Sequence, residues 1–487
     1  MQIKLENIGI VRDSTLKLDG LTVITGKNNS GKTTVGKTLY SMLEAVSNLK
    51  RKAQIDRNMY IEKQLDLVED ALTEKVSYQL SSELERALSS YPALQFMLFN
   101  DVDELEEDLE NYARKLARDL QRIDGSLLRP FERIRQSFSV RYTSSSLPIW
   151  SASPELPAFD TRRTAALAVL ERMFSALESD RELIDYARES INQTLRIEFS
   201  GQIQPVRTPD VTSSVKLSED RAEGPVYFQF SVFNDSVVND GSPVFFEAPF
   251  KRVYMIDDPF ILDHPLGRTP SRNTARRELD AILNPTRIQS HNYRLRQVLR
   301  SSSAVNVFEQ TLLDDLLRPV REQINHIVPG TFEFSSEGDY CVQNGTKIRI
   351  SNLATGSKVF SIIKLLLEKG LLDSDTMLIL DEPEAHLHPQ WQNVFAEVIV
   401  LLVKELHVNV LLTTHSPNFM LALDACMRKY EINQQTNFYQ TDVIEDGFVQ
   451  YRCVNENIEL IYDDFLQYLS EMKVLREQYL YDEEGDM

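Results

Sequence analysis

Cysteine is scarce in this sequence, and this scarcity excludes proteins held together by disulfides or structural zinc. The 487 residues contain 3 cysteines, Cys341, Cys426 and Cys453, at wide intervals. Such spacing forms neither a disulfide framework nor a zinc motif. A chain of this length can bury a sizeable core without either device. We therefore expect two or three structural units in a reducing compartment.

Long hydrophobic runs are also missing. The most apolar stretch, residues 394–414, is interrupted by charged or ionisable side chains and reads as a helix followed by a strand. The chain begins directly with strand-like sequence, so we expect no leader that needs to be cleaved. These features predict a cytoplasmic protein with no membrane contact.

Positive charge is in deficit, since 53 Lys and Arg residues face 73 Asp and Glu residues, a net charge of -20. This balance disfavours a global affinity for nucleic acid, which needs clustered cations. Residues 268–300 are an exception, with eight arginines and two acids. A solvated helix surface is the favoured interpretation of this segment, and the alternative is a docking site for DNA, RNA or an acidic protein that resembles DNA. Its leading residues are Arg268, Arg272, Arg276 and Arg277.

What the sequence does contain is a phosphate-binding loop, GKNNSGKT at residues 26–33, in the pattern GxxxxGK[ST]. Residues 21–24 predict a buried strand before it, and residues 33–42 a helix after it. Gly26 and Gly31 let successive backbone N–H groups surround phosphates at a helix N-terminus. Lys32 is expected to reach the β- and γ-phosphates, and the Thr33 hydroxyl to bind Mg²⁺. The predicted nucleotide-binding residues are Asn28, Asn29, Ser30, Gly31, Lys32, Thr33 and Thr34.

A second motif, LILDEPEAHLHP at residues 378–389, supplies acids at a strand tip. The apolar residues 377–380 predict a buried parallel strand. Asp381 is expected to hold Mg²⁺ directly or through water, and Glu382 to polarise the water that attacks the γ-phosphate. One helix later, residues 408–412 predict another strand, which ends in TTHSP. His415 there is a candidate contact to the γ-phosphate, with a structural role as the alternative.

Together, GKNNSGKTT, LDEPEAHLHPQWQ and TTHSP resemble the Walker A, Walker B and switch-histidine motifs of ABC-type ATPases of the RecF, SMC and OLD branch. The resemblance implies a homodimer or higher homo-oligomer that sandwiches two ATP molecules, with each site completed by a signature loop of the other subunit. NLATGSK resembles the family's signature LSxGxK. Ala354 replaces the family's serine, so the other residues of the loop must make the contact in trans. The candidate loop comprises Ala354, Thr355, Gly356, Ser357 and Lys358.

Two features leave alternatives open. Asp257 or Asp258 follows the apolar residues 253–256 and is a candidate for the family's glutamine loop, although an ordinary strand-ending turn is favoured. His386 and His388 form an HxH pair that can chelate a metal. No nearby Cys or third His completes such a site, and the resemblance assigns this stretch to the dimer interface.

The motif positions imply an α/β fold, an ABC-type ATPase head with a mixed sheet and a large, mostly helical, coiled-coil-like insertion. The core is expected at residues 1–45 and 251–430. Residues 46–250 are expected to hold the insertion and then a strand-rich segment, and residues 431–487 a strand, a helix and an acidic tail. Only 72 residues follow His415, too few for the Toprim nuclease domain of OLD-type proteins. We expect a slow ATPase without its own nuclease.

The resemblance extends to stand-alone ATPase subunits of prokaryotic antiphage systems, the AriA type of PARIS and next the PtuA type of Septu. It implies a sensor and scaffold that controls a separately encoded nuclease effector and responds to an acidic phage trigger protein or to DNA. The alternative is a RecF-like DNA-binding ATPase clamp in DNA repair. A housekeeping ATPase scaffold is a third interpretation.

Overall fold

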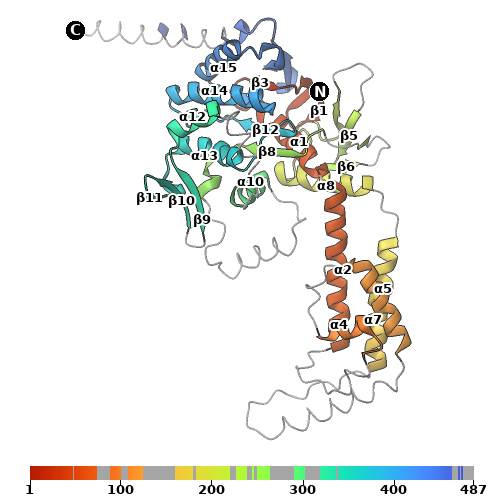
Figure 1. The fold of residues 1–487 in the computed structure, drawn as a ribbon. Helices are drawn as coiled ribbons and strands as arrows, with labels where there is room; N and C mark the ends of the chain where they lie inside the picture. Colours follow the sequence, from red (N-terminus) through yellow and green to blue (C-terminus); the bar gives the residue numbers. More distant parts are fainter. Residues whose placement is uncertain are drawn as a thin grey trace, which may run out of the picture. The chain divides into compact units, whose positions relative to one another are not determined.

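The computed structural model of the chain consists of two compact units (Figure 1). The first comprises residues 1–49 and 184–487, and the second residues 50–183. The residues that the structure describes are 1–47, 49–73, 88–99, 108–123, 159–178, 183–219, 226–238, 244–245, 249–263, 290–301, 318–335, 338–462, 470–471 and 473–474.

A mixed sheet forms the centre of the first unit and has 12 strands within these ranges. Five neighbouring strands are parallel, and the remainder of the sheet is mostly antiparallel. The order across the sheet is β6 (Ser236–Val238), β5 (Val226–Phe233), β4 (Ser213–Ser218), β1 (Gln2–Ile8), β2 (Val11–Lys17), β15 (Val449–Cys453), β14 (Thr436–Val443), β3 (Leu21–Thr25), β13 (Asn409–Thr414), β12 (Thr376–Asp381) and β8 (Arg252–Ile256), with β7 (Val244–Phe245) beside β5.

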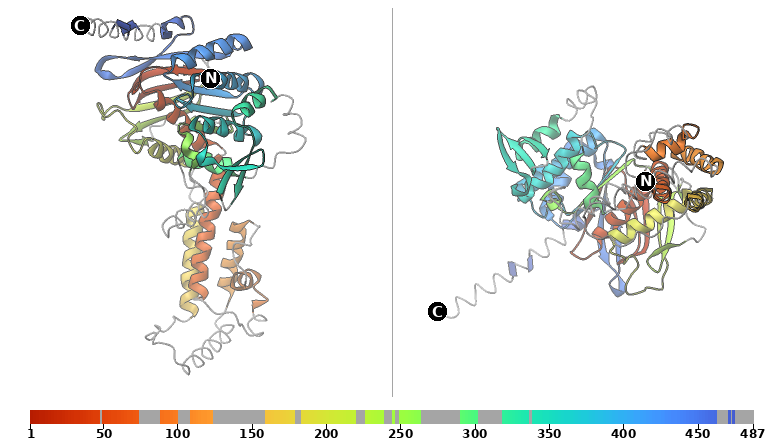
Figure 2. Two further views of the ribbon diagram at one scale, coloured as in Figure 1. Left: turned by 90° about the vertical axis from the view of Figure 1, so that its left-hand side faces the viewer. Right: turned by 90° about the horizontal axis from the view of Figure 1, so that it is seen from below.

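Four of the parallel strands, β3, β8, β12 and β13, are mostly apolar because helices cover both of their faces. Leu378 and Leu380 of β12 pack into one core cluster, and Met377 and Ile379 into another. The first cluster lies under α10 (His291–Arg300), α12 (Arg318–Ile327), α13 (Thr355–Glu368), α14 (Pro389–Leu406) and α15 (Pro417–Tyr430). The second lies under α1 (Lys32–Val46) and α8 (Leu183–Glu198). Figure 2 shows these helices around the sheet.

The segment before α13 carries a small antiparallel sheet of β9 (Thr331–Ser335), β10 (Gly338–Gln343) and β11 (Thr346–Arg349). A short 3-10 helix, η4 (Ile350–Asn352), joins β11 to the predicted signature loop. Another, η3 (Pro259–Asp263), follows β8 and packs against α13. The predicted signature loop therefore leads directly into a helix of the core.

The second unit is helical in the residues described, as the sequence predicts. It contains α2 (Leu49–Thr73), α4 (Pro92–Phe99), α5 (Leu109–Arg122) and α7 (Phe159–Glu178). Its apolar core includes Ile61, Leu65, Val68 and Leu72, which recur every three or four residues along α2. The Asp108 side chain accepts hydrogen bonds from the backbone N–H groups of Glu110 and Asn111, which fixes the start of α5. This unit thus has a core of its own.

The predicted boundaries differ from this division at two places. Residues 46–250 were expected to hold the helical insertion and then a strand-rich segment, but β4 of that segment pairs with β1, with Leu5 opposite Val215, and so belongs to the main sheet. Residues 431–487 were expected to form a strand, a helix and an acidic tail outside the core, but β14 lies between β3 and β15 inside the sheet. The local alternation of side chains predicts a strand without identifying its neighbours. Among the described helices, none is long and apolar enough to span a membrane.

Candidate nucleotide-binding site

The phosphate-binding loop connects β3 to α1 and is held by two strands from the far end of the chain. Gly31 has φ of 74° and caps the N-terminus of α1, a conformation that favours glycine. The Tyr451 hydroxyl on β15 donates a hydrogen bond to the Gly31 carbonyl over 2.7 Å. A Cβ at Gly26 would lie 1.8 Å from Thr441 Oγ1 on β14, so only glycine fits there. The loop conformation therefore depends on β14 and β15.

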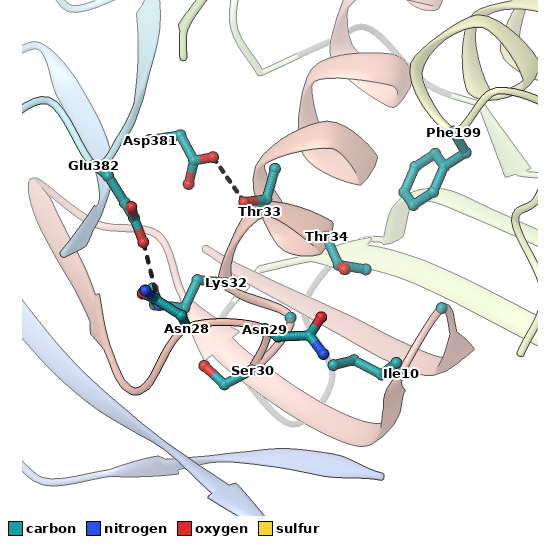
Figure 3. Close-up of a pocket in the computed structure, with 12 residues that line it drawn as sticks. Ile10, Asn28, Asn29, Ser30, Lys32, Thr33, Thr34, Phe199, Asp381 and Glu382 are labelled. Atoms are coloured by element: carbon teal, nitrogen blue, oxygen red, sulfur yellow. Dashed lines mark hydrogen bonds and ion pairs between the residues drawn. The ribbon is translucent and has the colours of Figure 1, made fainter. Parts of the chain in front are cut away.

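The Lys32 ammonium is at the centre of the loop. Its Nζ donates hydrogen bonds to the carbonyl oxygens of Gly26 over 2.9 Å and Lys27 over 2.8 Å. It also lies 3.3 Å from Glu382 Oε1, and Figure 3 shows this pair facing each other. The Lys32 side chain is only 4% exposed. The loop thus holds a positive charge at the N-terminus of α1, where an anion would be attracted.

Two oxygen ligands suited to Mg²⁺ lie side by side next to the loop. The Thr33 hydroxyl donates a hydrogen bond to Asp381 Oδ2 over 2.7 Å. The Thr413 hydroxyl donates to the other carboxylate oxygen of Asp381. Burial raises the pKa of Asp381, while the hydrogen bonds from Thr413 and Thr33 oppose that rise. A hydroxyl and a partly buried carboxylate at this spacing fit a hard divalent cation, which would also keep the carboxylate ionised.

Glu382 and His415 meet beside these groups. Glu382 adopts φ of 47°, and its backbone N–H donates to the Thr413 carbonyl over 3.1 Å, which fixes the turn after β12. His415 Nδ1 lies 3.2 Å from Glu382 Oε2. The predicted catalytic pair is therefore assembled at the tips of two adjacent parallel strands, where α/β sheets bind ligands.

Glu384 is a third acid of the same motif, and it orients His415. Its side chain is buried and accepts hydrogen bonds from the Thr414 hydroxyl and from the backbone N–H of His415, the latter over 3.3 Å. Burial raises the pKa of Glu384, and the hydrogen bond from Thr414 opposes the rise. The sequence prediction did not include Glu384, although it stands within the quoted motif.

The loop and the Walker B acids line a cavity of about 460 Å³, within the range of roughly 300–1,000 Å³ typical of ligand sites, whereas His415 is not among its described lining residues. All seven predicted loop residues line it, together with Asp381 and Glu382. The sequence prediction missed Gly9, Ile10 and Phe199 (Figure 3). Isolated apolar residues and a glycine carry no motif, so no local signal identifies them. Its full lining is Gly9, Ile10, Asn28, Asn29, Ser30, Gly31, Lys32, Thr33, Thr34, Phe199, Asp381 and Glu382.

The predicted signature loop is not among the described residues that line this cavity. Ala354 is exposed and precedes the first residue of α13, Thr355. A Cβ at Gly356 would lie 3.1 Å from the His386 carbonyl oxygen, so this glycine permits close packing against the segment after Walker B. Lys358 is 3% exposed and ion-paired with Asp263 of its own subunit over 2.6 Å. Ala354, Thr355 and Ser357 remain as the accessible residues of the loop.

The structure also shows the surroundings of Asp257, the glutamine-loop candidate, and of the HxH pair, the metal-site candidate. Asp257 lies at the tip of β8, and its Oδ1 is 2.9 Å from His291 Nε2, so it forms an ion pair as well as ending a strand. His386 packs edge-on against Phe260, and His388 caps α14. Within the described ranges, no three His, Cys, Asp or Glu side chains gather as a metal site. Arg268, Arg272, Arg276 and Arg277 lie outside the described residues.

Comparisons with known proteins give one family match and several similar solved structures. Residues 214–422, less than half of the chain, match the family described as AAA domain, putative AbiEii toxin, Type IV TA system. Among solved structures, the chain is similar to the SMC head domain from Thermotoga maritima, with 11% identity over 93% of this chain and 98% of that one, and a TM-score of 0.32. An SmcHead bound to the C-winged helix domain of ScpA gives 11% identity over 93% and 96%, with a TM-score of 0.39.

A third similar structure is the Smc head domain with a coiled coil and joint derived from Pyrococcus yayanosii, with 14% identity over 97% of this chain and 99% of that one, and a TM-score of 0.31. Identities and TM-scores this low say nothing about what the chain does. The α/β fold class predicted from the sequence is confirmed: a mixed sheet carries the phosphate-binding loop, and a large insertion is helical in the residues described.

Proposed function

We propose that the chain binds and hydrolyses Mg·ATP. The observation that carries this proposal is the convergence of Lys32, Thr33, Asp381 and Glu382 from two distant motifs in one cavity. Lys32 and the backbone N–H groups of the loop would neutralise the phosphates. Thr33 and Asp381 would hold Mg²⁺, which supplies charge neutralisation for the transferred phosphoryl group.

Hydrolysis in this site depends on how Glu382 is held. Its carboxylate would accept a proton from the attacking water, and His415, 3.2 Å away, would orient it and contact the γ-phosphate. Glu384 would keep His415 in place through the hydrogen bond to its backbone N–H. The Lys32–Glu382 ion pair must open before a phosphate occupies the loop, which is compatible with slow turnover.

The complete site is proposed to need two copies of the chain. The exposed Ala354, with Thr355 and Ser357 beside it, would face the γ-phosphate bound by a second subunit. Backbone N–H groups at the start of α13 would supply positive potential where the family's serine is replaced by alanine. This arrangement predicts a homodimer, or a higher homo-oligomer built from dimers.

For biological role, we favour a cytoplasmic sensor and scaffold of a prokaryotic antiphage complex that controls a separate nuclease, such as the AriA type of PARIS or the PtuA type of Septu. The motif resemblance supports this role. The match to a family whose description names a Type IV TA system supports it as well. A RecF-like DNA clamp is the alternative. The net charge of -20 argues against it, because a clamp must neutralise phosphates along DNA.

The test of the ATPase assignment compares Glu382→Gln with Lys32→Ala. Glu382→Gln removes the base but keeps the shape, so it should bind ATP like the parent and lose about 10²-fold or more in hydrolysis rate. Lys32→Ala removes the buried charge and should weaken ATP binding itself. Measurements of ATP binding by calorimetry and of phosphate release decide the matter. Hydrolysis at the parental rate by both variants would refute the assignment.

The biological role is tested by expressing tagged Glu382→Gln with its genomic neighbours and identifying what co-purifies in ATP. A stoichiometric nuclease that is absent from the Lys32→Ala purification would support the sensor. Co-purification of DNA alone, with hydrolysis stimulated by DNA and a steep salt dependence, would favour the clamp.

A further inference from the structure

The cavity has two chemically different ends. Lys32, Asp381 and Glu382 are at one end, and Ile10 and Phe199 at the other, with Thr34 between them (Figure 3). Ile10 and Phe199 pack against the second core cluster, but both remain partly exposed. Part of each side chain is therefore accessible to a ligand. A ligand with an anionic end and a flat apolar end would match both.

Phe199 is placed at this end by a set of specific contacts. It directly follows α8, and its backbone N–H donates to the Leu195 carbonyl over 2.8 Å. The preceding Glu198 accepts a hydrogen bond from the His291 backbone N–H over 2.9 Å and pairs with its ring. The Gly9 N–H donates to the Ile203 carbonyl over 2.9 Å, which joins the β1–β2 turn to the chain just after Phe199. These hydrogen bonds hold the backbone of Phe199 and of the β1–β2 turn that carries Ile10.

We propose that Phe199 and Ile10 form the base-binding end of the cavity, in which the nucleobase stacks on the Phe199 ring while the loop holds the phosphates. This inference rests on the proposed nucleotide-binding function and assigns a binding role to residues outside all of the recognised motifs. Stacking of a base on an aromatic side chain uses the whole face of the base and needs no charged partner. Phe199 would then determine affinity for nucleotide without contributing to binding of phosphate.

A binding experiment separates these two contributions. ADP carries the base and is not hydrolysed, whereas inorganic pyrophosphate has the phosphates and lacks the base. Their affinities are measured by calorimetry with Mg²⁺ for the parent and for Phe199→Ala, Phe199→Leu and Phe199→Trp. The matched control is Phe233→Ala, since Phe233 is 39% exposed and is not among the residues that line the cavity.

Loss of the ring should lower the affinity for ADP about tenfold in Phe199→Ala and Phe199→Leu. The affinity for pyrophosphate should stay within about twofold of the parental value. Phe199→Trp should bind ADP at least as well as the parent, and Phe233→Ala should change neither affinity. The inference is overturned if Phe199→Leu, which keeps the apolar volume, binds ADP like the parent. It is also overturned if the Phe199 variants lose affinity for ADP and for pyrophosphate by the same factor.

The same data keep this failure apart from failure of the proposed function. If the parent binds neither ADP nor pyrophosphate, or if Lys32→Ala binds both as well as the parent does, the nucleotide site itself is wrong and the base-binding inference falls with it. If the parent binds both and Lys32→Ala weakens both, the site stands and only Phe199 is in question.

Discussion

A buried charge cluster around His291 connects three elements next to the nucleotide cavity. His291 Nδ1 lies 2.6 Å from Glu198 Oε2 of α8, and Nε2 lies 2.9 Å from Asp257 Oδ1 at the tip of β8. Its ring also packs edge-on against Tyr40 of α1. Burial alone would lower the pKa of His291, but the hydrogen bonds and charges of Asp257 and Glu198 outweigh it and raise the pKa to about 9. The imidazole is therefore protonated at neutral pH.

This cluster predicts a pH-dependent stability. Because the folded-state pKa of His291 is raised, its stabilisation is complete below about pH 6.5 and is lost as the pH rises through about 9. His291→Gln removes the imidazolium that pairs with the buried Glu198 and the partly exposed Asp257, and should lower the free energy of unfolding by about 3 kcal/mol at pH 7. The difference from the parent should shrink towards pH 9.5 in thermal melts.

Exposed His326 on α12 provides the control, and His326→Gln should follow the parent at every pH. Parallel pH profiles for the parent and His291→Gln would show that the His291 ion pairs contribute nothing to stability.

Some residues of the candidate site could be predicted from the sequence, and others could not. Lys32, Thr33, Asp381 and Glu382 were identifiable because phosphate and Mg²⁺ chemistry requires fixed residue types at fixed spacing. Phe199 and Tyr451 were not, because an aromatic side chain at a helix end or on a strand is most often part of the core. Their positions at the site become apparent only in the structure. The Tyr451 hydroxyl donates a hydrogen bond to the Gly31 carbonyl, and Phe199 lines the cavity.

The close approach of the phosphate-binding loop to β14 predicts that a harmful substitution in the loop can be partly compensated by a second substitution in β14. A Cβ at Gly26 would lie 1.8 Å from Thr441 Oγ1 and 2.9 Å from its Cβ. Gly26→Ala should therefore displace the loop and weaken ADP binding at least about tenfold, whereas adding Thr441→Gly should restore part of that loss. Calorimetric ADP affinities of the parent, both single variants and the double variant measure the coupling.

Gly36→Ala is the comparison for this pair. A Cβ there would meet Ile379 at 3.0 Å and not Thr441, so Thr441→Gly should not rescue it. Strictly additive effects of Gly26→Ala and Thr441→Gly would mean that β14 does not constrain the loop.

Elements were predictable where their sequence carries one clear signal. The apolar runs that became β3, β8, β12 and β13 are buried on both faces, which makes them continuous and easy to recognise. The placement of β14 and β15 was not predictable. Thr436 of β14 pairs with Leu21 of β3, and no local pattern reports a neighbour so distant in sequence.

At the scale of the whole molecule, the proposed site is divided between two copies of the chain. The cavity is lined by the Walker A loop and the Walker B acids, whereas none of the described lining residues comes from the signature loop. If that loop acts in trans, each active site combines Lys32 of one subunit with Ala354 of the other. A variant that is defective in one half of the site should then be rescued by a variant defective in the other half.

Lys32→Ala and Ala354→Glu test this division. The exposed Ala354 tolerates a larger side chain, and a carboxylate there would repel the partner's γ-phosphate, so each variant alone should hydrolyse ATP slowly. In an equal mixture, half of the dimers would pair the two variants, and each would regain one intact site. Hydrolysis should therefore recover to about a quarter of the parental rate. Ala354→Gly, which adds no charge, should behave like the parent. A mixture no faster than its separate components would show that the signature loop acts within its own subunit, and the two-copy site would have to be abandoned.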